Sequence, residues 1–237
     1  VDKISVAQLG TQEVNTSELS GFSLDLGAYY SYKINPKLDL STSFVISPQT
    51  NMKSRNTRVI SSVFLINGFE PFEVDQLDEV NQTNTLKLPS KYTFGVGIGQ
   101  NKKWMLATEF TLQQSSNFGT RTNDLSKVDY ENGFKYSLGG YYIPNYSSFA
   151  NYFKKITYRA GFRYERTGMI INQERIRDYA ISGGFGLPLG GAFSNLNLGV
   201  ELGRRGTAKA LLIEENYTNV IISISLNDRW FIKRKYD

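Results

Sequence analysis

The stretch ITYRAGFRYE at residues 156–165 decides the fold. Apolar and aromatic side chains occupy every second position, and Thr, Arg, Gly and Glu lie between them. This period of two predicts a strand with one apolar face and one charged face. The pattern recurs along most of the chain, in long strands with Tyr-rich ends and connections of unequal length. The sequence therefore predicts an all-β fold, a transmembrane antiparallel β-barrel with lipid outside and a polar lumen.

The composition fits one large all-β domain. The chain has 237 residues, of which 40% are hydrophobic and 14% aromatic, more than a disordered chain would carry. No stretch approaches the roughly 18 uninterrupted apolar residues of a spanning helix. This excludes a helical membrane protein but leaves a barrel open, because every second strand residue and all loops can be polar.

The chain contains no Cys and no His, so disulfides, thiolate or imidazole catalysis and the usual zinc sites are excluded. We therefore expect neither an enzyme nor a bound metal or cofactor. The net charge of +5 is spread out, with clusters only at Arg204-Arg205 and at residues 233–235. We interpret both as water-exposed rims facing anionic lipid head groups, with nucleic-acid binding the weaker alternative. At Arg204-Arg205, contact with lipopolysaccharide phosphate is the alternative to simple solvation.

The alternation predicts nine barrel strands, at residues 22–34, 38–46, 92–98, 104–112, 134–142, 156–165, 179–187, 196–202 and 220–226. Residues 1–20 are only weakly patterned, and we expect a loop or lumenal segment there. Residues 47–90 are expected to form a long extracellular loop, with a candidate hairpin arm at residues 58–66. Its acidic run is interpreted as solvated charge, with a cation or partner site as the alternative; the run comprises Glu70, Glu73, Asp75, Asp78 and Glu79.

Short connections are expected in the periplasm and long ones outside the cell. An odd count of nine would place the two chain ends on opposite sides, whereas single-chain bacterial barrels have an even number of strands. We therefore expect residues 21–237 to be the C-terminal part of a larger single barrel, with at least one strand before them.

The charged faces of these strands predict a lumenal network whose members could contact a ligand head group: Glu109, Lys135, Arg159, Arg163, Glu165 and Glu201. Because an unpaired charge in a narrow lumen is costly, Arg159 and Arg163 are expected to pair with Glu201 or Glu109. The main interpretation is a structural ladder, and the alternative is an arginine that grips a carboxylate or phosphate. No carboxylate pair has a spacing that predicts catalysis.

Four aromatic residues are expected at the membrane–water interface: Trp104, Tyr142, Trp230 and Phe231. The connection at residues 143–155 carries Phe149, Tyr152 and Phe153 at helical spacing. It predicts either one amphipathic turn at the membrane surface or a simple packed turn.

Three segments carry a family resemblance: LPSKYTFGVGIGQNKKW at residues 88–104, residues 145–165, and ENYTNVIISISLNDRWFIKRKYD at residues 215–237. They resemble the FadL/OmpP1 family of outer-membrane transport proteins, especially its Bacteroidota versions. The resemblance implies a barrel of about 14 strands with an N-terminal plug, in the outer membrane of a Gram-negative bacterium. It also implies uptake of hydrophobic small molecules such as long-chain fatty acids.

Related barrels serve as non-transporting subunits, for example in a secretion translocon. Two hypotheses therefore remain, an uptake barrel without chemistry and a structural or adaptor subunit of a multi-protein outer-membrane complex. A soluble β-sandwich or propeller is the weakest alternative.

Overall fold

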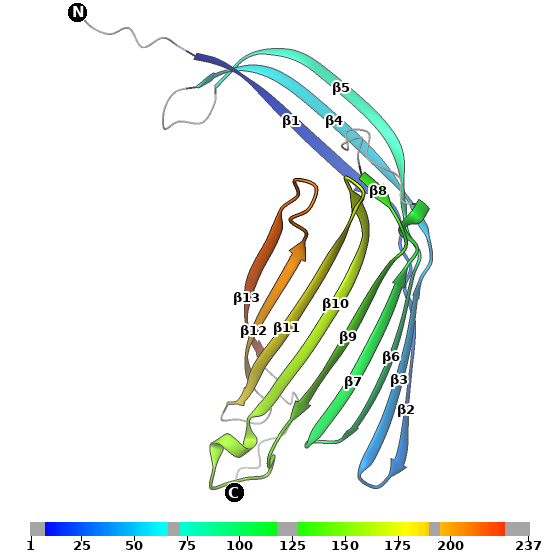
Figure 1. Cartoon of the computed structure of the whole chain (residues 1–237), viewed down its shortest axis with the longest axis vertical. Helices are drawn as coiled ribbons and strands as arrows, with labels where there is room; N and C mark the ends of the chain where they lie inside the picture. Colours follow the sequence, from blue (N-terminus) through cyan, green and yellow to red (C-terminus); the bar gives the residue numbers. More distant parts are fainter. Residues whose placement is uncertain (1–7, 66–71, 118–127, 190–194, 226–237) are drawn as a thin grey trace, which may run out of the picture. The chain divides into compact units, whose positions relative to one another are not determined.

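The computed structural model describes residues 8–65, 72–117, 128–189 and 195–225 (Figure 1). Strands dominate this part of the chain, which contains two short 3₁₀ helices, η1 (Ser115–Asn117) and η2 (Tyr152–Lys155). None of its helices is long and apolar enough to cross a membrane. The strands form two antiparallel sheets that belong to separate compact units. The expected all-β antiparallel fold is confirmed.

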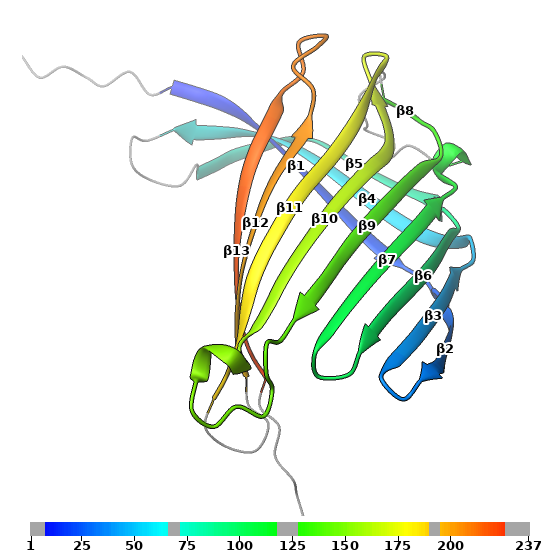
Figure 2. The same ribbon diagram turned by 60° about the horizontal axis from the view of Figure 1, so that its bottom comes forward.

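The larger sheet, called the large sheet below, contains ten strands, nine of them in one continuous path and β8 (Val128–Tyr130) paired with the end of β10. The nine path strands are those that the alternation predicts, and Figure 2 shows them side by side in one curved sheet. Among the described residues, β2 and β13 each pair on one side only. In path order the strands are β2 (Leu26–Asn35), β3 (Leu38–Ser47), β6 (Lys91–Gln100), β7 (Trp104–Gln113), β9 (Gly133–Tyr142), β10 (Thr157–Ile171), β11 (Glu174–Pro188), β12 (Asn195–Gly206) and β13 (Glu214–Ser225).

The smaller sheet, called the polar sheet below, corrects two predictions. β1 (Gln8–Ser20) is a strand within residues 1–20, where a loop or lumenal segment is expected from the sequence, and β4 (Thr50–Leu65) and β5 (Phe72–Leu88) occupy most of the loop expected at residues 47–90. β4 pairs with both neighbours, in the order β1-β4-β5. These strands are rich in Ser, Thr, Asn and Gln, which interrupt the apolar period of two along most of their length. The predicted arm at residues 58–66 coincides with the last part of β4.

Register places the apolar residues of the large sheet on one side, called the apolar face. Its middle is mostly aliphatic, with Phe162 between Leu138 and Ile181; its other aliphatic members are Val96, Ile98, Leu106, Val200 and Leu202. One aromatic row crosses it at Phe94, Phe110, Tyr136, Tyr164 and Tyr179, and a second at Trp104, Tyr142, Tyr158 and Phe185. Phe110 and Trp104 are six residues apart on β7, so the rows lie about 20 Å apart along the strand.

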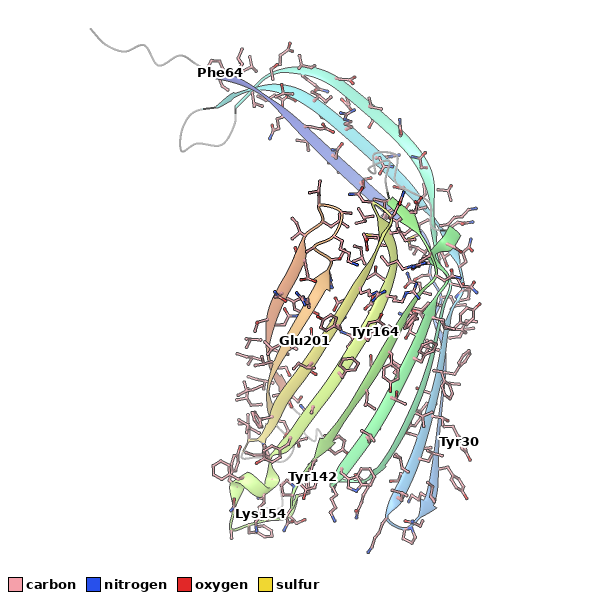
Figure 3. All side chains as sticks on the ribbon, in the orientation of Figure 1. Tyr30, Phe64, Tyr142, Lys154, Tyr164 and Glu201 are labelled. Carbon is pink, nitrogen blue, oxygen red and sulfur yellow. The ribbon has the colours of Figure 1, made fainter. Side chains whose placement is uncertain are left out.

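The apolar face is uncovered, since Ile181 is 59% exposed and Leu106 51%. Tyr30 and Tyr142, labelled in Figure 3, are 65% and 50% exposed. Soluble proteins rarely expose apolar patches of this extent. An aliphatic band between two aromatic rows is instead the pattern of a lipid-facing barrel wall.

Candidate functional site

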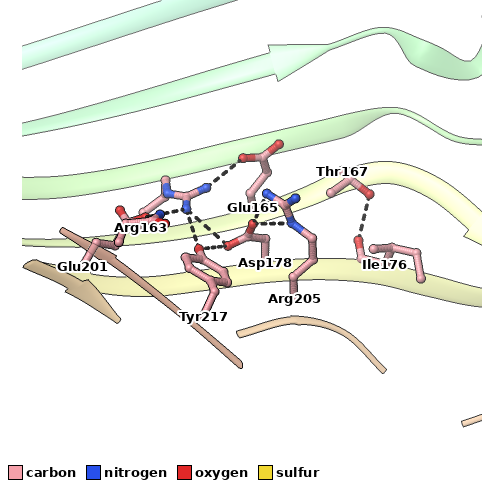
Figure 4. Close-up of polar contacts among 9 residues, drawn as sticks. Arg163, Glu165, Thr167, Ile176, Asp178, Glu201, Arg205 and Tyr217 are labelled. Atoms are coloured by element: carbon pink, nitrogen blue, oxygen red, sulfur yellow. Dashed lines mark hydrogen bonds and ion pairs between the residues drawn. The ribbon is translucent and has the colours of Figure 1, made fainter. Parts of the chain in front are cut away.

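A charged cluster lies on the opposite, polar face of the large sheet, around Asp178 of β11 (Figure 4). Asp178 is only 1% exposed. One carboxylate oxygen accepts a hydrogen bond from Nε of Arg205 at 2.8 Å, and the other accepts one from the Tyr217 hydroxyl at 2.9 Å. Nη2 of Arg163 lies 3.3 Å from the same carboxylate. The buried carboxylate is therefore paired with two guanidinium groups, as a buried charge must be to be tolerated.

Arg163 links the rest of the cluster. Its guanidinium donates to the Tyr217 hydroxyl at 2.8 Å and lies 3.4 Å from Glu165 and 3.5 Å from Glu201. The charges of the two arginines and three carboxylates nearly cancel and leave about one net negative charge. The ion pairs within the cluster therefore satisfy most of its charged groups.

Register explains why these residues meet. Glu165, Asp178 and Arg205 are direct cross-strand neighbours on β10, β11 and β12. Tyr217 stands opposite Gly203 on β12, and its ring crosses that position: a Cβ on Gly203 would lie 2.1 Å from the ring carbon that bears the hydroxyl. Only glycine leaves room for the ring there, which brings the phenol oxygen to Asp178 and Arg163.

Three of the six predicted lumenal residues belong to the charged cluster, and the other three lie outside it. Arg163, Glu165 and Glu201 belong to the cluster. Arg159 donates instead to Oδ1 of Asn197 at 2.7 Å. Within the described residues, Glu109 and Lys135 make no ion pair; both line a hollow of about 480 Å³ on the polar face.

Sequence reasoning missed three members of the cluster. Asp178 precedes the predicted strand at residues 179–187, which in the structure starts at Glu174. Arg205 lies beyond the predicted strand at residues 196–202 and is expected on a water-exposed rim, but β12 continues to Gly206 and turns this side chain to the polar face. Tyr217 precedes the predicted strand at residues 220–226, whereas β13 starts at Glu214. No alternation marks these strand ends in the sequence, because residues 174–178 read ERIRD and residues 203–206 read GRRG, with charged residues on both faces.

A second ion-pair group lies at the β8 end of the large sheet. Glu131 accepts hydrogen bonds from Arg166 at 2.6 Å and from Arg175 at 2.9 Å. Burial raises the pKa of the Glu131 carboxyl, but these guanidinium hydrogen bonds outweigh it and hold the pKa below its ordinary value. At the same end of the sheet, near the last residue of β12, Arg204 donates to the Tyr179 hydroxyl at 3.4 Å and pairs with Glu214.

Of the four aromatics expected at the interface, Trp104 and Tyr142 pair with each other in the second aromatic row. Trp230 and Phe231 lie outside the described residues. No group of acidic residues within the described ranges could hold a metal ion.

Comparison with known proteins identifies the family. The family model BamG matches residues 1–237. The chain belongs to the BamG family. The FadL assignment, by contrast, stays a prediction for this BamG-family chain. No curated protein matches it.

One solved structure similar to this BamG-family chain is the CymD monoaromatic hydrocarbon channel, at 15% identity and a TM-score of 0.49. The match covers 84% of the chain and 49% of the channel, so the chain spans about half the length of that protein.

Proposed function

We propose that the chain forms the wall of an outer-membrane β-barrel that serves as a structural or adaptor subunit of a multi-protein outer-membrane complex, with no chemistry of its own. Membership of the BamG family supports this proposal, because the family's name relates it to the BAM complex. The lipid-facing band between two aromatic rows supports the outer-membrane location.

The polar sheet is the observation that carries the adaptor role. Its three strands have 13, 16 and 17 residues, longer than the roughly 9 to 11 that cross a membrane. Side chains bond across it from strand to strand: Ser17 to Asn56 at 2.8 Å, and Thr57 to Asn81 at 2.7 Å. Burying such a polar surface in lipid would be costly, so the sheet is expected in water, where another protein can reach it.

The charged cluster fits the same role. Arg163 is already surrounded by Asp178, Glu165, Glu201 and the Tyr217 hydroxyl, so it has little capacity left to grip a ligand head group. A self-contained network ties β10, β11, β12 and β13 together and stiffens the wall.

The test replaces residues 49–88 with a short Gly-Ser linker in the full-length protein, purified from its native membrane in mild detergent. We expect the variant to stay folded and heat-modifiable on gels but to lose the proteins that co-purify with the natural form. Retention of the same partners, or the absence of partners from the natural protein, would contradict the adaptor proposal.

Uptake of a hydrophobic small molecule is the second candidate, and one observation favours it. Gly97, Ala107, Gly139 and Gly161 are cross-strand neighbours on the polar face, where they line hollows of about 370 and 530 Å³. These small residues leave space beside the wall for a bound molecule.

Ala107→Phe fills this space, and Val96→Phe adds comparable bulk on the apolar face of β6 as its control. If the protein takes up hydrophobic molecules, the natural protein should bind oleate. Ala107→Phe should abolish this binding, and Val96→Phe should leave it intact. Absence of oleate binding to the natural protein would remove this candidate.

A further inference from the structure

We propose that the connection between β9 and β10, residues 143–156, is a docking element for an anionic lipid surface. The inference is independent of the adaptor role. It begins from Phe149, which is 100% exposed, and Phe153, which is 70% exposed. Large aromatic side chains left uncovered in this way mark an interaction surface.

The connection is fixed in place by its own hydrogen bonds. Asn151 caps η2, its side chain accepting from the Phe153 amide at 3.0 Å, and the Asn145 amide donates to the Lys154 carbonyl at 2.8 Å. Ile143 and Ile156 at its ends are buried, at 7% and 6% exposure. The segment therefore presents Phe149 and Phe153 from a defined backbone rather than from a loose loop.

Neighbouring strands hold the connection as well. The Tyr152 hydroxyl donates to the Pro188 carbonyl of β11 at 3.0 Å, and the Tyr158 hydroxyl of β10 donates to the Phe153 carbonyl at 3.2 Å. Tyr158 belongs to the second aromatic row of the apolar face. The exposed rings of Phe149 and Phe153 therefore lie next to that row, at the edge of the lipid-facing surface. Aromatic rings at that depth occupy the head-group layer.

The charge around these rings has one sign. Residues 143–156 contain Lys154 and Lys155 and no carboxylate, and the adjoining β6–β7 turn contributes Lys102 and Lys103. Figure 3 labels Lys154 at this end of the large sheet. The Lys155 ammonium lies 5.5 Å from the centre of the Phe149 ring, and the Lys102 ammonium lies 4.9 Å from that of Tyr146.

Exposed aromatics among lysines match an anionic bilayer surface, because the rings enter the head-group layer while the ammonium groups meet the lipid phosphates. A protein partner is the other occupant that could cover such a surface. The basic charge and the continuity with the lipid-facing face favour lipid.

The chain has no Cys, so Phe149→Cys provides a unique site for a nitroxide spin label. The labelled full-length protein is reconstituted in vesicles of phosphatidylcholine, with or without phosphatidylglycerol. Accessibility to oxygen, which partitions into lipid, is compared with accessibility to a neutral, water-soluble nickel complex. We expect position 149 to favour oxygen, and more strongly when phosphatidylglycerol is present.

Leu211→Cys is the matched control, because Leu211 is equally exposed but lies in the β12–β13 connection. Its label should favour the nickel complex in both vesicles. Replacing Lys154 and Lys155 with Gln should remove the added effect of phosphatidylglycerol, lowering the buried-to-exposed ratio of the label at position 149 by roughly fivefold per lysine. Labels at positions 149 and 211 that are equally open to the nickel complex would overturn the proposal, as would protection that appears only with a co-purified protein.

Discussion

The large sheet and the polar sheet are built from the same backbone element, the long antiparallel strand in regular register, yet their side chains meet different surroundings. In the large sheet most residues on one face are apolar and many are exposed, as at Ile181, while the opposite face buries Asp178 among arginines. In the polar sheet both faces carry hydroxyl, amide and charged groups. The difference shows that the distribution of polar residues over the two faces indicates whether a sheet borders lipid or water. Strand length and pairing indicate this less well.

The largest expected effect comes from removing the buried carboxylate of the large sheet. Asp178→Ala leaves Arg163 and Arg205 without their main partner, so the free energy of unfolding should fall by about 3 to 5 kcal/mol. Urea unfolding in vesicles, followed by tryptophan fluorescence, measures this. Asp78→Ala on exposed β5 is the control and should have little effect. An equal loss of unfolding free energy in the two variants would show that the carboxylate of Asp178 is no more important to its sheet than that of Asp78.

A lysine on the apolar face should be nearly as harmful. Leu138→Lys places a charge in the aliphatic band, where lipid contact should reduce the free energy of unfolding by about 2 to 4 kcal/mol. Val14→Lys in β1 starts from a comparably exposed valine, 46% against 39% for Leu138, and should be nearly neutral because water surrounds it. The same unfolding assay decides, and a neutral Leu138→Lys would argue against lipid on the apolar face.

Gly203→Ala tests the packing of the Tyr217 ring with a single methyl group. The new Cβ collides with the ring and displaces its hydroxyl from Asp178, at an expected cost of about 1 to 3 kcal/mol. Gly183→Ala is its control on the same sheet, since the nearest atom to that Cβ would be 3.9 Å away. If both variants unfold at the same urea concentration, the ring does not depend on Gly203.

The smallest expected effect lies in the polar sheet. Hydrogen bonds from Arg58 and then Asn15 lower the pKa of the exposed Glu13 carboxyl. Because the folded-state pKa is lowered, this contact stabilises the sheet above the ordinary carboxyl pKa and is lost as the pH falls through the lowered value. Arg58→Ala should raise the Glu13 pKa toward its ordinary value, as measured by carboxyl ¹³C NMR of the glutamate-labelled protein. An unchanged pKa would mean that the pair does not form in solution.

The sequence was sufficient to predict the nine path strands of the large sheet, though not β8, because exposure to lipid on one side imposes an apolar period on them. It was insufficient for β1, β4 and β5, whose pairing relies on backbone hydrogen bonds and polar side chains that also occur in loops. Within the site, alternation assigned Arg163, Glu165 and Glu201 to one face. It could not show that Asp178 lies among them, because cross-strand neighbours depend on register between strands.

The hairpin of β4 and β5 has a consequence for how the chain folds. Most neighbouring strands of the large sheet follow one another closely along the chain, but β3 and β6 pair across a separation of about 40 residues, from Ser47 to Lys91. Thr50 and Leu88 are already paired in the β4–β5 ladder, which reduces that long loop to a few residues on each side. Once formed, the β4–β5 hairpin removes most of the entropy cost of closing the loop between β3 and β6. We therefore expect the hairpin to form before β3 pairs with β6.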